Sequence, residues 1–219
     1  MNPLTKLALG RLGLLEPKPA SATGVGTGIE LPAPCRSGGM PLMQALNERQ
    51  SLREFAPTAL AAQTLSDLLW AAAGINREAV EGRTAPSAMN SHEIDLYVAL
   101  PEGLYLYEPQ RHALELRVKS DVRCVTGYQD FVDDAALDLI YVADLARMKL
   151  VPAVHRESYA AAAAGAMAQN VYLFCASAGL ATVIRAWIDR GILAHAMQLG
   201  TEQTILLSQT VGCIKSGAG

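Results

Sequence analysis

The sequence predicts an α+β protein in which a mixed central sheet has helices on both of its faces. Segments typical of strands are flanked by helical segments without a regular βα alternation, and one strand segment is a nearly continuous apolar run. The 219 residues are enough for one domain with a sizeable core. Because 51% of the residues are hydrophobic and only 18% are charged, we expect part of the apolar surface to be covered by a partner, most simply a second copy.

The chain divides by composition near residue 40. Residues 1–40 are predicted to form a Pro/Gly-rich N-terminal arm, because the stretch that ends in LPAPCRSGGM cannot pack a core by itself. Residues 41–219 are predicted to form the folded domain. This domain opens with a short helix in PLMQALNER.

The first half of the domain alternates one helix with strands. TLSDLLWAAAG is predicted to be a helix, with Thr64 and Asp67 as a capping pair and Gly74 as its end. The segment EGRTAPSAMNSHE has the composition of a loop. IDLYVAL alternates as a strand does, and GLYLYEPQRHALELRV is typical of a hairpin with its turn near Pro109.

The second half contains the longest helical segment. LDLIYVAD is typical of a central strand covered on both faces. ESYAAAAAGAMAQNVYLFCASAG is predicted to be a helix, and its alanines and Gly165 would let another helix approach closely, although a simple buried helix explains the pattern equally well. IDRGILAHAMQLG is predicted to be a further helix, and TILLSQTVG the last strand.

Charge and cysteine content argue against several classes of protein. A net charge of −3 provides no basic field for a polyanion, so we expect no nucleic-acid partner. The four cysteines lie far apart without metal-ligand spacing, which predicts reduced thiols and no metal site. No segment reaches the roughly 20 apolar residues of a membrane span. We therefore expect a cytoplasmic protein without a membrane partner.

The stretch NERQSLREF places Arg49, Ser51 and Arg53 at every second position. On extended backbone these three side chains point the same way. Two guanidinium groups and a hydroxyl suit a phosphate or another compact anion. The alternative is an exposed basic strand that pairs with surface acids such as Glu48 and Glu54.

Two further segments have the residue types of a ligand site. In APSAMN, Pro86 restrains the backbone, while Ser87 and Asn90 offer short polar groups that can bond either the backbone of a turn or a ligand. In AGLATVIRAW, small side chains permit a close approach of the backbone to a flat ligand. An ordinary joint between a helix and a loop has the same composition.

The order of these segments resembles that of the FMN-dependent nitroreductase superfamily. The order is RxSxR, a helix ending near LLWAAAGINR, RTAPSxxN, QNVYLFCASAGLATV and finally QTVG. The similarity covers residues 41–215 and is nearest to the branch that contains the oxidase subunits of azole-forming peptide modification systems. It implies a nitroreductase-like fold with a mainly antiparallel sheet, and an intertwined homodimer with FMN at the subunit interface.

The resemblance also implies roles for individual residues. The residues matching Arg49 and Ser51 hold the phosphate and ribityl chain of FMN, the residue matching Arg53 reaches the pyrimidine edge of the flavin, and the APSAMN loop lines the ring. Departures from the family pattern occur at Ser91-His92-Glu93 and at Arg185-Ala186-Trp187. The implied cofactor-binding set is Arg49, Gln50, Ser51, Arg53, Pro86, Ser87, Ala88, Asn90, Ile184, Arg185, Ala186 and Lys215.

The implied activity is an oxidoreductase reaction. NADH or NADPH would pass hydride to FMN, and the reduced flavin would pass electrons to a small organic acceptor such as a nitroaromatic or a quinone. No catalytic side chain is expected, because the cofactor carries the chemistry. The alternatives are a flavin-dependent dehydrogenase of a bound substrate, of the azoline-to-azole type, a flavin-binding module without turnover, and a structural oligomer without a cofactor.

Overall fold

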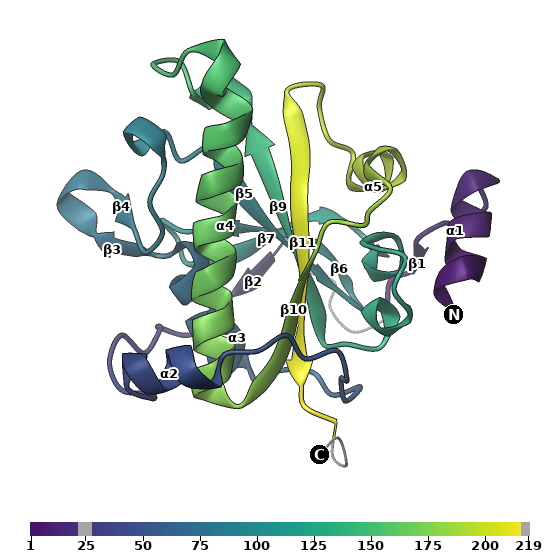
Figure 1. The fold of residues 1–219 in the computed structure, drawn as a ribbon, viewed down its shortest axis with the longest axis horizontal. Helices are drawn as coiled ribbons and strands as arrows, with labels where there is room; N and C mark the ends of the chain where they lie inside the picture. The colour runs from purple at the N-terminus through teal and green to yellow at the C-terminus, as the bar shows by residue number, and fades with distance from the viewer. Residues whose placement is uncertain (22–27, 216–219) are drawn as a thin grey trace.

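The protein is built on a seven-stranded sheet with the order β10-β11-β9-β5-β6-β7-β2 (Figure 1). The computed structural model describes residues 1–21 and 28–215. Every pairing between these seven strands is antiparallel. The predicted α+β fold with a mainly antiparallel sheet is therefore confirmed, whereas the prediction that the sheet is mixed is wrong, because none of these pairings is parallel. The strands are β2 (Gly28–Glu30), β5 (Ile94–Leu100), β6 (Gly103–Glu108), β7 (Ala113–Val118), β9 (Leu137–Asp144), β10 (Leu180–Arg185) and β11 (Gln203–Cys213).

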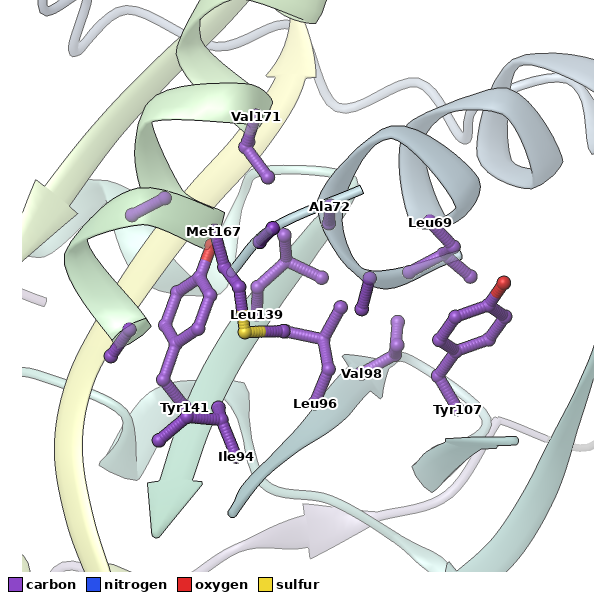
Figure 2. Packing of buried hydrophobic residues seen from close by; sticks show 14 of the residues in the cluster. Leu69, Ala72, Ile94, Leu96, Val98, Tyr107, Leu139, Tyr141, Met167 and Val171 are labelled. Carbon is purple, nitrogen blue, oxygen red and sulfur yellow. The ribbon is translucent and has the colours of Figure 1, made fainter. Parts of the chain in front are cut away.

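Helices cover both faces of the sheet, as the sequence predicts. On one face, α3 (Ala62–Ala73) and the long α4 (Ala153–Ala178) pack on the strands, and their leucine, alanine and methionine side chains form the main core (Figure 2). On the other face, α5 (Arg190–Met197) covers a smaller cluster, with α1 (Pro3–Arg11) beyond it (Figure 1). Helix α2 (Leu42–Glu48) lies beside the C-terminal part of α4.

Strand β9 lies between β5 and β11 and is buried at seven of its eight residues. Its side chains alternate between the two clusters, as shown by Leu139 in the main core and Ile140 in the smaller one. The predicted hairpin is also present as β6 and β7. The remaining short strands pair in twos, β1 (Lys18–Pro19) with β8 (Ser120–Asp121) and β3 (Ile75–Arg77) with β4 (Gly82–Arg83).

The start of α3 differs from the prediction. The helix begins at Ala62, and its N-cap residue Ala61 provides no side-chain hydrogen bond, so Thr64 and Asp67 are not a capping pair. Asp67 instead accepts hydrogen bonds from the backbone N–H of Cys35 (2.7 Å) and from Gln63 Nε2 (2.9 Å). The carboxylate therefore ties the preceding Pro-rich segment to the helix, a tertiary contact that overrides the local capping pattern.

Helix α4 ends as expected, at a glycine in the left-handed region. Gly179 has φ 67°, and its N–H donates to the carbonyl of Cys175. A residue with a Cβ is disfavoured in this conformation, so glycine permits the sharp turn into β10. The turn brings β10 back alongside the last part of α4.

The N-terminal region contains regular structure that contacts the rest of the chain. In α1, Lys6 is fully buried, and its Nζ lies 2.6 Å from Asp133 Oδ1 and 3.0 Å from the carbonyl of Gln129. Strand β2 forms one edge of the main sheet. The division at residue 40 into an arm and a domain stays a prediction.

Candidate functional site

A hollow lies at the C-terminal end of α4, between that helix, the segment after α2 and the start of β10. Its volume is about 370 Å³. We call it the C-terminal hollow. Two of the residues predicted to bind the cofactor, Arg49 and Gln50, contribute to its wall. Its lining is completed by Asn47, Glu48, Leu52, Tyr172, Cys175, Ala176, Gly179, Leu180, Thr182 and Ile214.

Tyr172 joins three of the chain segments around this hollow. Its hydroxyl lies 2.8 Å from Ser51 Oγ and accepts a hydrogen bond from the backbone N–H of Ile184 at 3.0 Å. The guanidinium of Arg49 lies over its ring, 5.3 Å from the ring centroid. The alternating pattern thus brings Arg49 and Ser51 to one side chain. Arg53 Nη1 instead donates to the carbonyl of Ser51 at 3.4 Å.

The segment after α2 bonds to part of the outer edge of the sheet. The backbone N–H of Leu52 donates to the carbonyl of Thr182 in β10 (3.0 Å). Further along, Phe55 pairs with Ile214, and the N–H of Lys215 donates to the carbonyl of Glu54 at 3.4 Å. These bonds place Lys215 beside the segment that carries the two arginines.

The hydrogen bonds at the outer edge of β10 show which of its main-chain groups face away from β11. The carbonyl of Thr182 and the N–H of Ile184 both bond away from β11. In an antiparallel ladder such outward-facing residues alternate with those that bond to the neighbouring strand. The main-chain groups of Ile184 therefore face the free edge, whereas those of Arg185 face β11.

The side chain of Arg185 lies on the opposite face of the sheet, in a buried ion pair. Its Nη2 is 2.7 Å from Asp138 Oδ1, and its Nη1 donates to the carbonyl of Thr126 at 2.8 Å. Burial lowers the pKa of Arg185 and raises the pKa of Asp138, while their mutual attraction opposes both shifts. Thr126 and Thr210 also donate to Asp138. The Arg185 side chain is thus part of the structural core, away from the hollow.

The basic groups near the C-terminal hollow are not neutralised by acids. Within residues 1–21 and 28–215, no ion pair involves Arg49, Arg53 or Lys215. Pairing with Glu48 or Glu54, the alternative interpretation of the sequence, is not observed. Three cationic side chains and a hydroxyl therefore remain available to an anion.

The APSAMN loop lies at a different place on α4. Pro86 and Ser87 line a small hollow with Ala163 and Met167, which we call the mid-helix hollow. Ala163 precedes Tyr172 by nine residues, or about 14 Å along the helix axis. Ala88 and Asn90 follow on a single 3-10 turn. The lining residues of the two hollows do not overlap, so the single chain does not place these loop residues in the C-terminal hollow.

The loop backbone is held in an uncommon conformation. Met89, Asn90 and His92 have φ values of 53°, 54° and 48°. Such angles are unfavourable for residues other than glycine, and they occur often at binding sites. Ser87 Oγ accepts a hydrogen bond from the His92 N–H (3.2 Å), and Asn90 Oδ1 lies 2.9 Å from His92 Nε2. Burial, and next the nearby Arg83 guanidinium, lower the pKa of His92.

The single chain brings together one part of the predicted set. Arg49 and Gln50 line the C-terminal hollow, and Ser51 and Ile184 bond to its lining residue Tyr172, with Arg53 and Lys215 on the adjoining backbone. Ala186 follows β10 and is exposed. The loop residues Pro86, Ser87, Ala88 and Asn90 lie elsewhere.

Two residues that hold this region together, Tyr172 and Asn170, lie outside the set expected from the sequence. Asn170 Nδ2 donates to the carbonyls of Ala71 (3.0 Å) and Thr84 (3.4 Å), which fastens the start of the loop to α3 and α4. Both residues lie in the alanine-rich helix. A polar side chain among alanines was the one signal that could have found them.

Fold and site together define an α+β protein with a basic hollow at the free edge of an antiparallel sheet. The chain belongs to the Nitroreductase family, whose profile matches residues 46–213. It is 33% identical over 163 residues to a "Putative nitroreductase" of Methanocaldococcus jannaschii, covering 69% of this chain and 81% of that protein. The family expected from the sequence is confirmed.

Solved structures of other proteins share this fold. A crystal structure of a "putative nitroreductase" from Ralstonia eutropha has a TM-score of 0.88 and 52% identity, covering 92% of this chain and 96% of that one. A chain of the Escherichia coli microcin synthetase McbBCD complex, with truncated pro-MccB17 bound, has a TM-score of 0.69 and 17% identity, covering 99% and 95%. The latter likeness shows the fold alone.

The described residues offer neither a metal site nor a membrane-spanning helix. Among residues 1–21 and 28–215, no group of three or more histidine, cysteine or acidic side chains is placed to hold a metal ion. All four cysteines are free thiols. No helix in the described part of the chain is both long and apolar enough to cross a membrane.

Proposed function

We propose that the protein is an FMN-dependent oxidoreductase. It would take hydride from NADH or NADPH and reduce an organic acceptor such as a nitroaromatic or a quinone. The observation that carries this proposal is the C-terminal hollow, where Arg49, Ser51 and the free edge of β10 at Ile184 meet. Family membership supports the same cofactor.

The residues at this hollow fit the chemistry of FMN. Arg49 and Ser51 would bind the phosphate, and Lys215 lies on the adjoining strand to contribute a further positive charge. The main chain of Ile184 would contact the edge of the flavin ring. Arg53 would stabilise the negative charge that develops on the ring during reduction. When bound, FMN supplies the hydride-transfer chemistry, so no protein acid or base needs to lie in the hollow.

We further propose that the working form is a homodimer. On α4, Ala161, Ala162, Gly165 and Gln169 form an exposed stripe of mostly small residues. A Cβ at Gly165 would meet no atom within 4 Å, so packing within the described chain does not require a glycine there. Close approach of a helix from a second copy would require one.

Large apolar side chains are also exposed on α2, beside the C-terminal part of α4. On the neighbouring α2, Leu42, Met43 and Leu46 are 64%, 75% and 45% exposed. Exposed small and apolar residues of this kind are typical of an interface between subunits. A second copy seated on them would cover them, and we propose that it brings its loop residues Pro86, Ser87, Ala88 and Asn90 to the flavin.

The proposal is tested by purifying the protein, recording its visible spectrum and identifying any released flavin. NADH and NADPH are then added separately, with and without a quinone. We expect bound FMN and sustained oxidation of a nicotinamide nucleotide that depends on the quinone. Bound FMN that neither nucleotide reduces would indicate a dehydrogenase of another substrate or a binding module. A protein that stays colourless after FMN is added would overturn the proposal.

A further inference from the structure

Tyr172 lies between the two parts of the chain that we propose hold opposite ends of the cofactor. It comes from α4, is 7% exposed, and contacts Ser51 on one side and Ile184 on the other. Its ring lies beneath the guanidinium of Arg49. One side chain thus contacts three residues of the proposed FMN site without itself belonging to the predicted set.

The donors available fix the direction of one of these hydrogen bonds. The backbone N–H of Ile184 can only donate, so the Tyr172 oxygen accepts there. The phenol has one proton of its own, which it can donate to Ser51 Oγ at 2.8 Å. With Ser51 accepting from Tyr172, the proton of the Ser51 hydroxyl remains free to donate to a ligand.

The ring of Tyr172 similarly keeps Arg49 available to a ligand. A guanidinium within about 6 Å of an aromatic centroid is attracted to the ring face, and Arg49 lies at 5.3 Å. No ion pair within the described residues competes for this guanidinium. The aromatic face therefore limits the side-chain positions that Arg49 samples and keeps its charge at the hollow.

We propose that Tyr172 is the positioning residue for the phosphate group of the cofactor. Its hydroxyl orients Ser51 as a hydrogen-bond donor, and its ring holds Arg49, while the bond to Ile184 ties both to the edge of β10. This inference rests on the proposed function, because it concerns how that same site distinguishes a phosphorylated flavin from an unphosphorylated one.

The test compares the dissociation constants of FMN and riboflavin, which differ by the phosphate. Tyr172→Phe keeps the ring but removes the hydroxyl. We expect it to weaken FMN binding by about 3- to 10-fold, the range for loss of one neutral hydrogen bond. Riboflavin affinity should change by a smaller factor, so the preference for FMN should fall. Tyr172→Leu also removes the ring and should lower the preference further.

Two further variants separate positioning from a general structural role. Tyr159→Phe removes a hydroxyl from an exposed tyrosine of the same helix and should leave the preference unchanged. In a Ser51→Ala background, Tyr172→Phe should cause no additional loss of preference, because the two residues act as one unit. Thermal unfolding of each variant reports whether the fold is retained.

The outcomes distinguish this inference from the proposed function. If the wild-type protein binds FMN and Tyr172→Phe weakens FMN and riboflavin by the same factor, the positioning role is wrong and Tyr172 is structural. Unchanged FMN affinity in that variant would also overturn it. If the wild-type protein binds neither flavin, the proposed function fails and the inference fails with it.

Discussion

Helix α4 carries two candidate binding regions that are built in different ways. At its C-terminal end, hydrogen bonds join segments far apart in the sequence, from Ser51 through Tyr172 to Ile184. Near Met167, by contrast, the loop of residues 86–92 bonds mainly to itself and holds three residues at positive φ. The first region is held together by hydrogen bonds between distant parts of the single chain. The second is a loop that is held mainly by its own hydrogen bonds.

This difference indicates how the site is divided. A flavin needs contacts both for its phosphate and for its ring, and the chain provides basic groups at the C-terminal hollow and short polar loop groups at the mid-helix hollow. The exposed stripe of α4 around Gly165 lies on the same turns of the helix as the mid-helix hollow. A second copy packed on this stripe would complete the site, which is the basis of the proposed dimer.

The largest expected effect is a loss of stability at Arg185, a structural residue that lies away from the C-terminal hollow. Arg185→Leu would leave Asp138 buried without its ionic partner, a change that typically costs about 3–5 kcal/mol. We expect the free energy of unfolding, measured with denaturant, to fall by that amount. The preference for FMN over riboflavin should be unchanged in the folded protein. A lost preference with normal stability would show that the Arg185 side chain belongs to the site.

The next largest effect concerns FMN binding at the C-terminal hollow. Arg49→Gln removes a charge-assisted hydrogen bond to the phosphate, and we expect the dissociation constant of FMN to rise by about 10- to 100-fold. Arg36→Gln is the matched control, because Arg36 also lies over an aromatic ring, that of Trp70, at 5.8 Å. Fluorescence titration gives both constants. Equal losses in the two variants would contradict the assignment of the phosphate end.

The proposed interface at the exposed stripe of α4 is tested by placing a larger side chain in it. Gly165→Leu places a large side chain where we propose that a partner helix approaches, while the single chain has room for it. We expect the dimer dissociation constant to rise by about 10- to 100-fold, from the 1–3 kcal/mol typical of overpacking. Analytical ultracentrifugation measures it, with the exposed Ala178→Leu as the control. A Gly165→Leu dimer of wild-type strength would place the interface elsewhere.

A smaller effect is expected at the loop. Ser87→Ala removes one neutral hydrogen-bonding group, so FMN affinity should fall by about 3- to 10-fold in the dimer. In the Gly165→Leu background, where the subunits separate, the same substitution should have no further effect on FMN affinity. If Ser87→Ala weakens binding equally in both backgrounds, the loop contacts the flavin of its own chain.

The smallest effect is a pH dependence of the loop. Because burial lowers the pKa of His92 below its ordinary value, the unfolded state binds the proton more readily as the pH falls. Stability from neutral His92 is present above about pH 6.5 and is lost as the pH decreases through the folded-state pKa. We expect the free energy of unfolding of the wild-type protein to fall between about pH 7.5 and about pH 5.0. The fall should be larger than that of His92→Gln. Parallel pH profiles would contradict this.

Much of the fold could be predicted from the sequence because it depends on local pattern. The alternation in IDLYVAL, the apolar run of β9 and Gly179 at the end of α4 each determine a local element. The cap of α3 could not be predicted, because Asp67 bonds to Cys35, a residue distant in the sequence. The alternation of Arg49 and Ser51 indicated an anion site, but not that Tyr172 would join them.

The direction in which each side chain of the site points was the feature hardest to predict from the sequence. Arg185 and Ile184 are neighbours, yet the side chain of Arg185 pairs with Asp138 in the core while the N–H of Ile184 bonds to Tyr172 beside the hollow. That division depends on which edge of β10 is free, which only the order of strands reveals. Likewise, the sequence could not indicate that RxSxR and APSAMN occupy separate hollows of one chain.

The most direct measurement is native mass spectrometry of the purified protein titrated with FMN. We predict that FMN is retained by the dimer, up to two molecules per two chains, and that separated Gly165→Leu subunits retain it much more weakly. Monomers that hold FMN as tightly as the dimer would contradict a site completed by two copies.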